Sequence, residues 1–280
     1  MCEDAGVRIL VTNDDGIDAD GLHVLAERLA KLDCGPEVVV AAPDREYSGA
    51  SAAVGTLHLM HPEVRRVSGL GVAEAWSVTG PPALCAIFAR LGVFGGPFDL
   101  VVAGINPGAN TGRAVYHSGT VGAAVTARIG GVSGVAVSQA VVGFGVEGQG
   151  WDEMLEGQLW DSAAEVGARV VDALLADLPD DPVVLNVNVP NLPVEHLAGW
   201  RRTEVATRPP RGLASARLVP MAGHEGAFDV EMDWGEPVEL PVETDSGALE
   251  AGFVSVTALS RVFDDPAVDL GDVATILDAL

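Results

Sequence analysis

The sequence predicts an α/β fold with a doubly wound, mostly parallel sheet and a β-hairpin extension toward the C-terminus. Short apolar runs alternate with helix-like segments through the first two thirds of the chain, and most of these runs are continuous rather than alternating in polarity. Continuous apolar strands are typical of a parallel sheet that is buried on both faces. Repeated strand and helix units then imply right-handed crossovers between neighbouring strands.

The expected strands are rich in valine and isoleucine, and the segments between them have helical spacing. In the first helical segment, Leu22, Leu25, Ala26 and Leu29 fall on one face of a helix. We expect strands over 7–12, 37–42, 98–103, 134–138 and 183–189, and helices over 20–32, 81–91, 120–129 and 159–178.

The character of the sequence changes after Pro190. Residues 199–259 contain prolines, glycines and short alternating stretches such as "FDVEMDW" and "GFVSVTAL", which indicate hairpins. This part has no apolar core of its own, so we expect it to pack on the sheet or on another subunit. The chain is therefore expected to consist of a core over 1–198, a hairpin arm over 199–262 of the same domain, and a C-terminal helix within 263–280, from about 266 to 279.

The charge of the chain limits its partners. Its 40 acidic and 16 basic residues give a net charge of −24, which repels nucleic-acid duplexes and anionic membranes. The three cysteines are an odd number without C-x-x-C spacing, which argues against a disulfide framework and a zinc ribbon. The N-terminal stretch does not resemble a signal peptide, and no stretch reads as a membrane span. We therefore expect a cytoplasmic protein.

Polar residues follow three of the expected strands, where ligands bind in doubly wound sheets. The three segments are "NDDG", "APDREYSGAS" and "GINPGANTGRAVYHSGT". Their candidate side chains are Asn13, Asp14, Asp15, Asp44, Arg45, Ser48, Ser51, Asn106, Asn110, Ser118 and Thr120. Each segment alone also fits an ordinary glycine-rich turn, but together they offer the oxygen ligands that Mg²⁺, Mn²⁺ or Ca²⁺ prefer. A cation between Asp14 and Asp15 would also relieve the repulsion of adjacent carboxylates.

The third segment ends in Ser118, Gly119 and Thr120, which open a helix of small apolar residues. Exposed amides at a helix N-terminus bind anions, and beside a cation the expected anion is a phosphate. Ser118 or Thr120 could instead simply cap the helix, and both roles are compatible.

Several familiar signatures are absent from the sequence. It contains no G-x-x-x-x-G-K-[ST] motif, no G-x-G-x-x-G after the first strand and no G-x-S-x-G elbow. The adjacent acidic pair also differs from the D-x-D of haloacid-dehalogenase-like phosphatases. We expect surface or packing roles for His58 and His61. His117 lies in the third segment, where we expect it to shape the substrate site or the loop.

In combination, these motifs resemble the survival protein E family, the SurE-type 5′/3′-nucleotidases. The matching stretches are "ILVTNDDGIDADGL", "VVAAPDREYSGAS" and "VVAGINPGANTGRAVYHSGTVGAA", with weaker matches in "LNVNVPN" and "ETDSGALEAGFVSVTAL". The resemblance implies a Rossmann-like core, a hairpin arm used in homodimers or homotetramers, and one divalent cation. It also implies that Asp14, Asp15, Ser48 and Asn106 are the metal ligands.

The activity implied by the resemblance is that of a 5′-nucleotidase, a phosphomonoesterase acting on nucleoside 5′- and 3′-monophosphates, with polyphosphate as a further substrate in some members. Two departures from the family pattern bear on substrate and assembly. They are "TGRAV", where acidic residues are common in the family, and a short arm between Thr207 and Asp233.

The mechanism we expect is in-line attack of water on phosphorus, with Asp14 and Asp15 as the catalytic residues and Asp14 as the preferred proton acceptor. The expected substrate contacts are Asn13, Asn110, Ser118, Gly119 and Thr120. Two alternatives remain open from the sequence. One is a phosphatase for a sugar phosphate or a specialised-metabolite phosphate, and the other is a non-catalytic nucleotide-binding module on the same fold.

Overall fold

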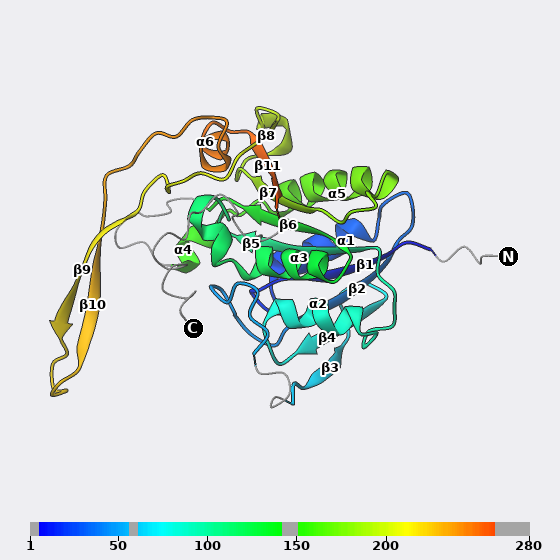
Figure 1. The fold of residues 1–280 in the computed structure, drawn as a ribbon, viewed down its shortest axis with the longest axis horizontal. Helices are drawn as coiled ribbons and strands as arrows, with labels where there is room; N and C mark the ends of the chain where they lie inside the picture. Colours follow the sequence, from blue (N-terminus) through cyan, green and yellow to red (C-terminus); the bar gives the residue numbers. More distant parts are fainter. Residues whose placement is uncertain (1–5, 56–60, 142–150, 261–280) are drawn as a thin grey trace, which may run out of the picture.

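The computed structural model describes residues 6–55, 61–141 and 151–260, and it shows an α/β body with a projecting hairpin (Figure 1). The strands are β1 (Arg8–Thr12), β2 (Glu37–Pro43), β3 (Val64–Val67), β4 (Glu74–Val78), β5 (Leu100–Pro107), β6 (Ser133–Gln139), β7 (Val184–Val189), β8 (Trp200–Arg202), β9 (Leu213–Pro220), β10 (Phe228–Trp234) and β11 (Val254–Leu259). The helices are α1 (Asp20–Leu29), α2 (Pro82–Arg90), α3 (Gly119–Ile129), α4 (Trp151–Leu155), α5 (Trp160–Ala176) and α6 (Asp245–Glu250), and the 3-10 turns are η1 (Gly112–Tyr116) and η2 (Val194–His196).

The central sheet has the strand order β3-β4-β2-β1-β5-β6-β7-β11-β8. Its pairs are parallel except for β3 with β4 and β11 with β7. The predicted doubly wound, mostly parallel sheet is therefore confirmed. The chain passes from β1 to β2 on one side and later returns to add β5 on the other side of β1. The strand order thus reverses next to β1, and ligands of such sheets bind beyond the carboxyl ends of the strands at this point.

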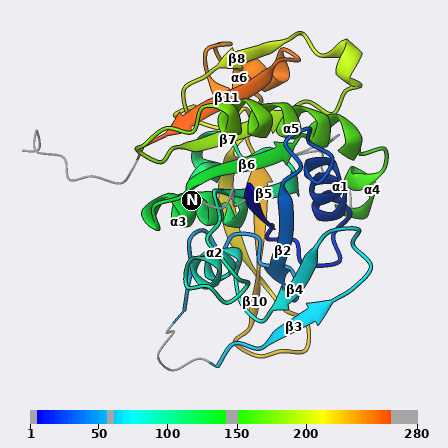
Figure 2. The same ribbon diagram turned by 90° about the vertical axis from the view of Figure 1, so that its right-hand side faces the viewer.

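Helices cover both faces of the sheet, as Figure 2 shows. Along β1, Ile9 and Val11 pack into a cluster with α1 and α5, whereas Leu10 packs into a second cluster with α2 and α3. Successive strand residues point to opposite faces, so an uninterrupted apolar strand fills both cores at once. This is why the apolar runs in the sequence lack alternation.

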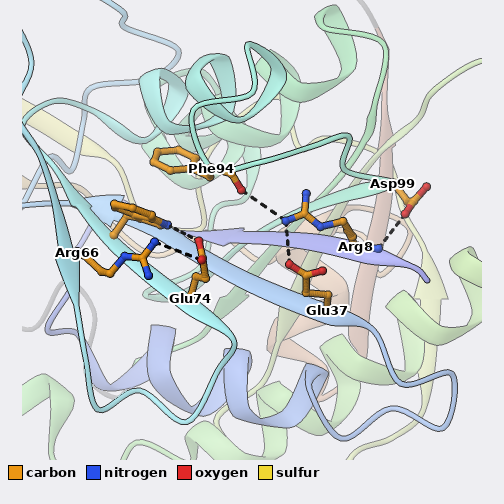
Figure 3. A network of polar contacts seen from close by, with 7 residues as sticks. Arg8, Glu37, Arg66, Glu74, Phe94 and Asp99 are labelled. Carbon is orange, nitrogen blue, oxygen red and sulfur yellow. Dashed lines mark hydrogen bonds and ion pairs between the residues drawn. The ribbon is translucent and has the colours of Figure 1, made fainter. Parts of the chain in front are cut away.

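The amino ends of the strands are fixed by a polar network on the edge away from the candidate site (Figure 3). The Arg8 guanidinium donates to Glu37 Oε1 at 2.8 Å and to the Phe94 carbonyl at 3.4 Å. The Arg8 backbone amide donates to Asp99 Oδ2 at 2.8 Å. These bonds join β1 to β2 and to the segment that enters β5, the strands that carry the site at their other ends.

The observed elements differ from the expected ones mainly at the sheet edges. The strands β3 and β4 are additional, and α1 stops at Leu29 rather than at residue 32. In β3 the exposed Arg65 and Arg66 hide the strand signal, because an edge strand needs little apolar surface. β5 runs on to Pro107, so Asn106 belongs to a strand and not to a loop.

The region expected as a hairpin arm divides into two parts. The strands β8 and β11 join the central sheet, and only β9 and β10 form a separate two-stranded sheet that projects from the body (Figure 1). The stretch "GFVSVTAL" therefore supplies a sheet strand antiparallel to β7 rather than part of the arm. His58 and the expected C-terminal helix lie outside the described residues, and His61 is exposed.

The described helices include none that is both long enough and apolar enough to cross a bilayer. Of the two cysteines within the described residues, Cys34 is exposed and Cys85 is buried. Burial raises the pKa of the Cys85 thiol to about 12, so this cysteine behaves as a small apolar side chain of the core.

Candidate metal centre

The turn after β1 places two acidic side chains at the carboxyl edge of the sheet. Asn13 is fully buried, and its amide donates to the Gly16 carbonyl at 2.9 Å while its oxygen accepts from the Gly16 amide at 3.3 Å. Gly16 has φ of +106°, a conformation that side-chain-bearing residues rarely adopt. Beyond this turn the Asp14 side chain reaches the beginning of α3.

Asp14 is bonded to the N-terminus of α3. Its Oδ2 accepts from the Gly119 amide at 3.0 Å, and its Oδ1 accepts from the Thr120 hydroxyl. A Cβ atom at Gly119 would lie 2.7 Å from Asp14 Oδ2, so only glycine allows this approach. Asp14 is 2% exposed, and burial raises the pKa of its carboxyl while the bond from Thr120 lowers it. The anion held by this helix N-terminus is therefore a carboxylate of the protein itself.

Asp15 carries a carboxylate oxygen that has no hydrogen-bond partner in the described part of the chain. Its Oδ2 is buried and accepts no hydrogen bond within the described residues. Burial raises the pKa of Asp15 to about 8, and the charges of Asp14 and Glu46 add to the increase. A buried carboxylate oxygen without a partner is costly unless a proton or a cation compensates it.

Asn106 supplies a neutral oxygen on the other side of Asp14. Its amide nitrogen donates to the Gly108 carbonyl at 2.7 Å and to the Pro107 carbonyl at 3.2 Å, which turns its oxygen the other way. This Oδ1 lies 3.4 Å from the Thr120 hydroxyl, which is itself bonded to Asp14. The ends of β1 and β5 thus bring carboxylate and amide oxygens together.

The loop after β2 is bonded both to the turn after β1 and to the segment that precedes α3. The Tyr47 amide donates to the Asp14 carbonyl at 2.7 Å, and the Ser51 amide donates to the His117 carbonyl at 3.0 Å. Gly122 permits the second contact, because a Cβ there would lie 2.2 Å from the Ser51 carbonyl oxygen. The exposed Ser48 lies between these two fixed points. All three sequence segments therefore meet at one edge of the sheet.

The expected substrate contacts change on these observations. The Asn13 amide is committed to its own turn, and the Asn110 amide nitrogen donates to Ser138 Oγ at 2.9 Å. Ser118 caps α3, since its Oγ accepts from the Val121 amide at 3.0 Å. The Gly119 and Thr120 groups hold Asp14. These polar groups therefore bind other parts of the protein in this structure, and their contact with a phosphate stays a prediction.

Two groups of residues that support the site were not expected from the sequence. Asn188 Oδ1 accepts from the backbone amide of Asn110 at 2.8 Å, and the side-chain amide of Asn186 donates to the backbone carbonyl of Asn110 at 2.8 Å. The buried Asp245 accepts from the Gly112 amide at 2.8 Å. The asparagines have a signal in "LNVNVPN", two amides on an otherwise apolar strand, and Asp245 lies in the weaker match "ETDSGALEAGFVSVTAL", which does not show its partners because they are distant in sequence.

The donor set fits a hard divalent cation. No cluster of three or more histidine, cysteine or acidic side chains suited to a metal occurs in 6–55, 61–141 and 151–260. A cation here would depend on two carboxylates and on neutral amide and hydroxyl oxygens, the donors preferred by Mg²⁺, Mn²⁺ and Ca²⁺. The unpartnered oxygen of Asp15 is the observation that most directly indicates a missing positive charge.

Comparison with known proteins gives consistent results over nearly the whole chain. The family model described as survival protein SurE matches residues 9–211. A 5′-nucleotidase SurE from Haemophilus influenzae is 34% identical, over 90% of this chain and 91% of the relative. A 5′-nucleotidase SurE from Xanthomonas campestris pv. campestris is 35% identical, over 98% and 99%.

A solved structure shows the same fold. The crystal structure of the SurE protein from Aquifex aeolicus superposes with a TM-score of 0.76 at 27% identity, covering 97% of this chain and 99% of that one. The chain therefore belongs to the survival protein SurE family.

Proposed function

We propose that this protein is a metal-dependent 5′-nucleotidase, which hydrolyses nucleoside 5′-monophosphates to nucleoside and phosphate. The relatives named 5′-nucleotidase SurE cover the chain almost end to end, which supports the activity. The observation that carries the proposal is the buried, unpartnered Oδ2 of Asp15 beside the buried Asp14. It supports a site built for a cation, which would stabilise the charge that develops on the phosphate.

In this proposal Asp14, Asp15, Ser48 and Asn106 hold the cation. A bound divalent cation supplies positive charge to the phosphate oxygens and to the charge that develops in the transition state. The Gly119 amide and the Thr120 hydroxyl fix Asp14, whose carboxyl pKa is raised overall by burial, and a bound cation would favour its ionised form. Both Asp14 oxygens already accept hydrogen bonds and the unpartnered Asp15 oxygen is assigned to the cation, so the proposed acceptor of the water proton stays one of these two aspartates.

The test is phosphate release from a panel of phosphomonoesters with and without EDTA. We expect release from nucleoside 5′-monophosphates that is lost in EDTA and restored by Mg²⁺ or Mn²⁺. Equal release in EDTA, or none from any nucleoside monophosphate at saturating metal, would overturn the proposal. The panel includes 3′-monophosphates, polyphosphate and sugar phosphates. The sugar-phosphate and non-catalytic alternatives are not favoured, because the relatives are named nucleotidases.

The arm supports a proposal about assembly. In the β9–β10 register, Leu218 pairs with Val230 and Ala216 with Met232, and these side chains share one face. The opposite face carries Arg217 paired with Glu231. Val230 is 58% exposed and Leu218 is 66% exposed, and a two-stranded hairpin with such a bare apolar face is not stable alone. We propose that this face packs against a second copy of the chain in a homodimer or homotetramer.

The two faces of the arm provide a matched test. Val230→Arg puts a charge on the apolar face, and we expect it to shift a dimer or larger species toward monomer in sedimentation velocity. Val219→Arg makes the same change on the polar face, opposite Asp229, and should leave the assembly intact. A monomeric wild-type protein at tens of micromolar, or equal behaviour of the two variants, would contradict the role of this face.

The cytoplasmic location stays a prediction from the sequence.

A further inference from the structure

The Asp245 carboxylate lies where the base of the hairpin arm meets the candidate site. Asp245 is fully buried at the start of α6. Its Oδ2 accepts from the Gly112 amide at 2.8 Å, and its Oδ1 accepts from the Ala206 amide at 3.0 Å and the Ser246 amide at 2.8 Å. One oxygen therefore holds the segment after Asn110, and the other holds the chain that leads into β9.

The two ends of the arm are joined at the same point. The Glu204 amide donates to the Glu243 carbonyl at 2.9 Å, and the Asp245 amide donates to the Glu204 carbonyl at 2.8 Å. The outgoing and returning chains thus form a short ladder that ends at the Asp245 side chain. Any movement of the arm that pulls on this ladder acts directly on the carboxylate.

The other side of the carboxylate leads to the metal centre. Gly112 opens η1, and a Cβ there would lie 3.2 Å from the Ala206 carbonyl oxygen, so η1 and the arm base are in close contact. The Ser246 hydroxyl adds a bond to Thr111 Oγ1 at 2.9 Å. From Gly112 the chain needs only η1 to reach the N-terminus of α3, where Gly119 holds Asp14.

We propose that Asp245 is a positioning residue that couples the hairpin arm to the metal centre, so that packing of the arm against a second copy orders the η1 segment and tightens metal and substrate binding. This inference rests on the proposed function and on the assembly through the arm. A carboxylate suits the task because two acceptor oxygens serve two segments. An asparagine offers one oxygen, and its amide nitrogen would face an N–H group on one side.

The first test compares Asp245→Asn with Glu243→Gln, which removes a charge from an exposed neighbouring side chain. We expect Asp245→Asn to increase amide exchange over residues 112–118 by about tenfold or more. We also expect the Mn²⁺ concentration for half-saturation and the KM to rise about tenfold, with kcat changed less than about threefold, as for residues that orient metal ligands. Glu243→Gln should match the wild type in each measurement.

The second test asks whether the arm and the site are coupled through this residue. Val230→Arg, which lies far along the arm, should also increase exchange over 112–118, and this effect should disappear in the background of Asp245→Asn. If Asp245→Asn does not fold, Ser246→Ala removes the hydroxyl bond to Thr111 and the long contact with Asp245 Oδ1 at 3.5 Å, and it should give a smaller effect of the same direction.

Faster exchange confined to 203–208, or additive effects of the two substitutions, would overturn the coupling. Exchange and Mn²⁺ binding are measured without substrate. If the protein released no phosphate from any nucleotide, the proposed function would be refuted, but the exchange and Mn²⁺-binding measurements would still test the role of Asp245.

Discussion

Asp14→Asn is expected to lower kcat/KM for a nucleoside 5′-monophosphate by about 10³-fold or more at saturating Mg²⁺ or Mn²⁺. The substitution removes one of the two negative charges of the proposed cation site. It also turns an acceptor into a donor, because the asparagine amide would face either the Gly119 amide or the Thr120 hydroxyl. Steady-state phosphate release over a range of metal concentrations would show the effect as lower activity together with weaker metal dependence.

Asp18→Asn is the matched control for this substitution. Asp18 is exposed four residues further along the chain, so its replacement changes the net charge equally without contacting the site. We expect activity within about twofold of the wild type, because solvent and salt screen an exposed charge. An Asp14→Asn protein that folds, as judged by circular dichroism, and keeps activity within tenfold would exclude the arrangement of ligands proposed here.

The fold was largely predictable because the signals of its core strands are local. Strands buried on both faces are mostly apolar without alternation, so β1, β2, β5 and β6 each stand out as an apolar run, and β7 stands out despite its two buried asparagines. The edge strand β3 escapes this rule, because solvent tolerates its arginines. β11 was assigned to the arm because its antiparallel partner, β7, lies far away in the sequence, and alternation alone does not show which sheet a strand joins.

The candidate site was predictable at the level of which segments meet, since the carboxyl ends of neighbouring parallel strands share one edge. The sequence did not predict which polar groups of the site bind other parts of the protein. From the sequence, Asn13, Asn110 and Gly119 look like groups available to a ligand, yet in the structure each is bonded to the protein. Whether a polar group serves a ligand or the fold depends on contacts such as that between Asp14 and Gly119, which lie 105 residues apart.

The contact between Asp14 and Gly119 also explains why the first residue of α3 is a glycine. The usual inference from a glycine and hydroxyl residues at a helix N-terminus is a phosphate site. Here the carboxylate of Asp14 takes that place, and in the proposed cation site the hydrogen bonds from the helix N-terminus would favour the ionised form of this ligand. In the proposed site the phosphate would then bind mainly to the cation.

Gly119→Ala is the second substitution for which we expect a large loss of activity, although it adds only a methyl group. Its Cβ would lie 2.7 Å from both Cβ and Oδ2 of Asp14 and 3.0 Å from the carboxyl carbon, too close for either residue to keep its place. Displacing Asp14 breaks its bond to the helix and moves it away from Asn106. We expect kcat/KM to fall about 10²-fold to 10³-fold and Mn²⁺ binding, measured by calorimetry, to weaken in parallel.

The effect on stability separates this explanation from simple unfolding. Alanine favours a helix by up to about 1 kcal/mol over glycine, which partly offsets the loss of the bond to Asp14. The variant should therefore stay folded while it loses the metal. Gly167→Ala makes the same change within α5, where the nearest neighbours are side-chain methyl groups of Val137 and Leu25 at 3.3–3.4 Å that can shift. Gly167→Ala should keep both activity and Mn²⁺ affinity. If the two variants lost activity and Mn²⁺ affinity equally, the effect of Gly119→Ala would not come from displacing Asp14.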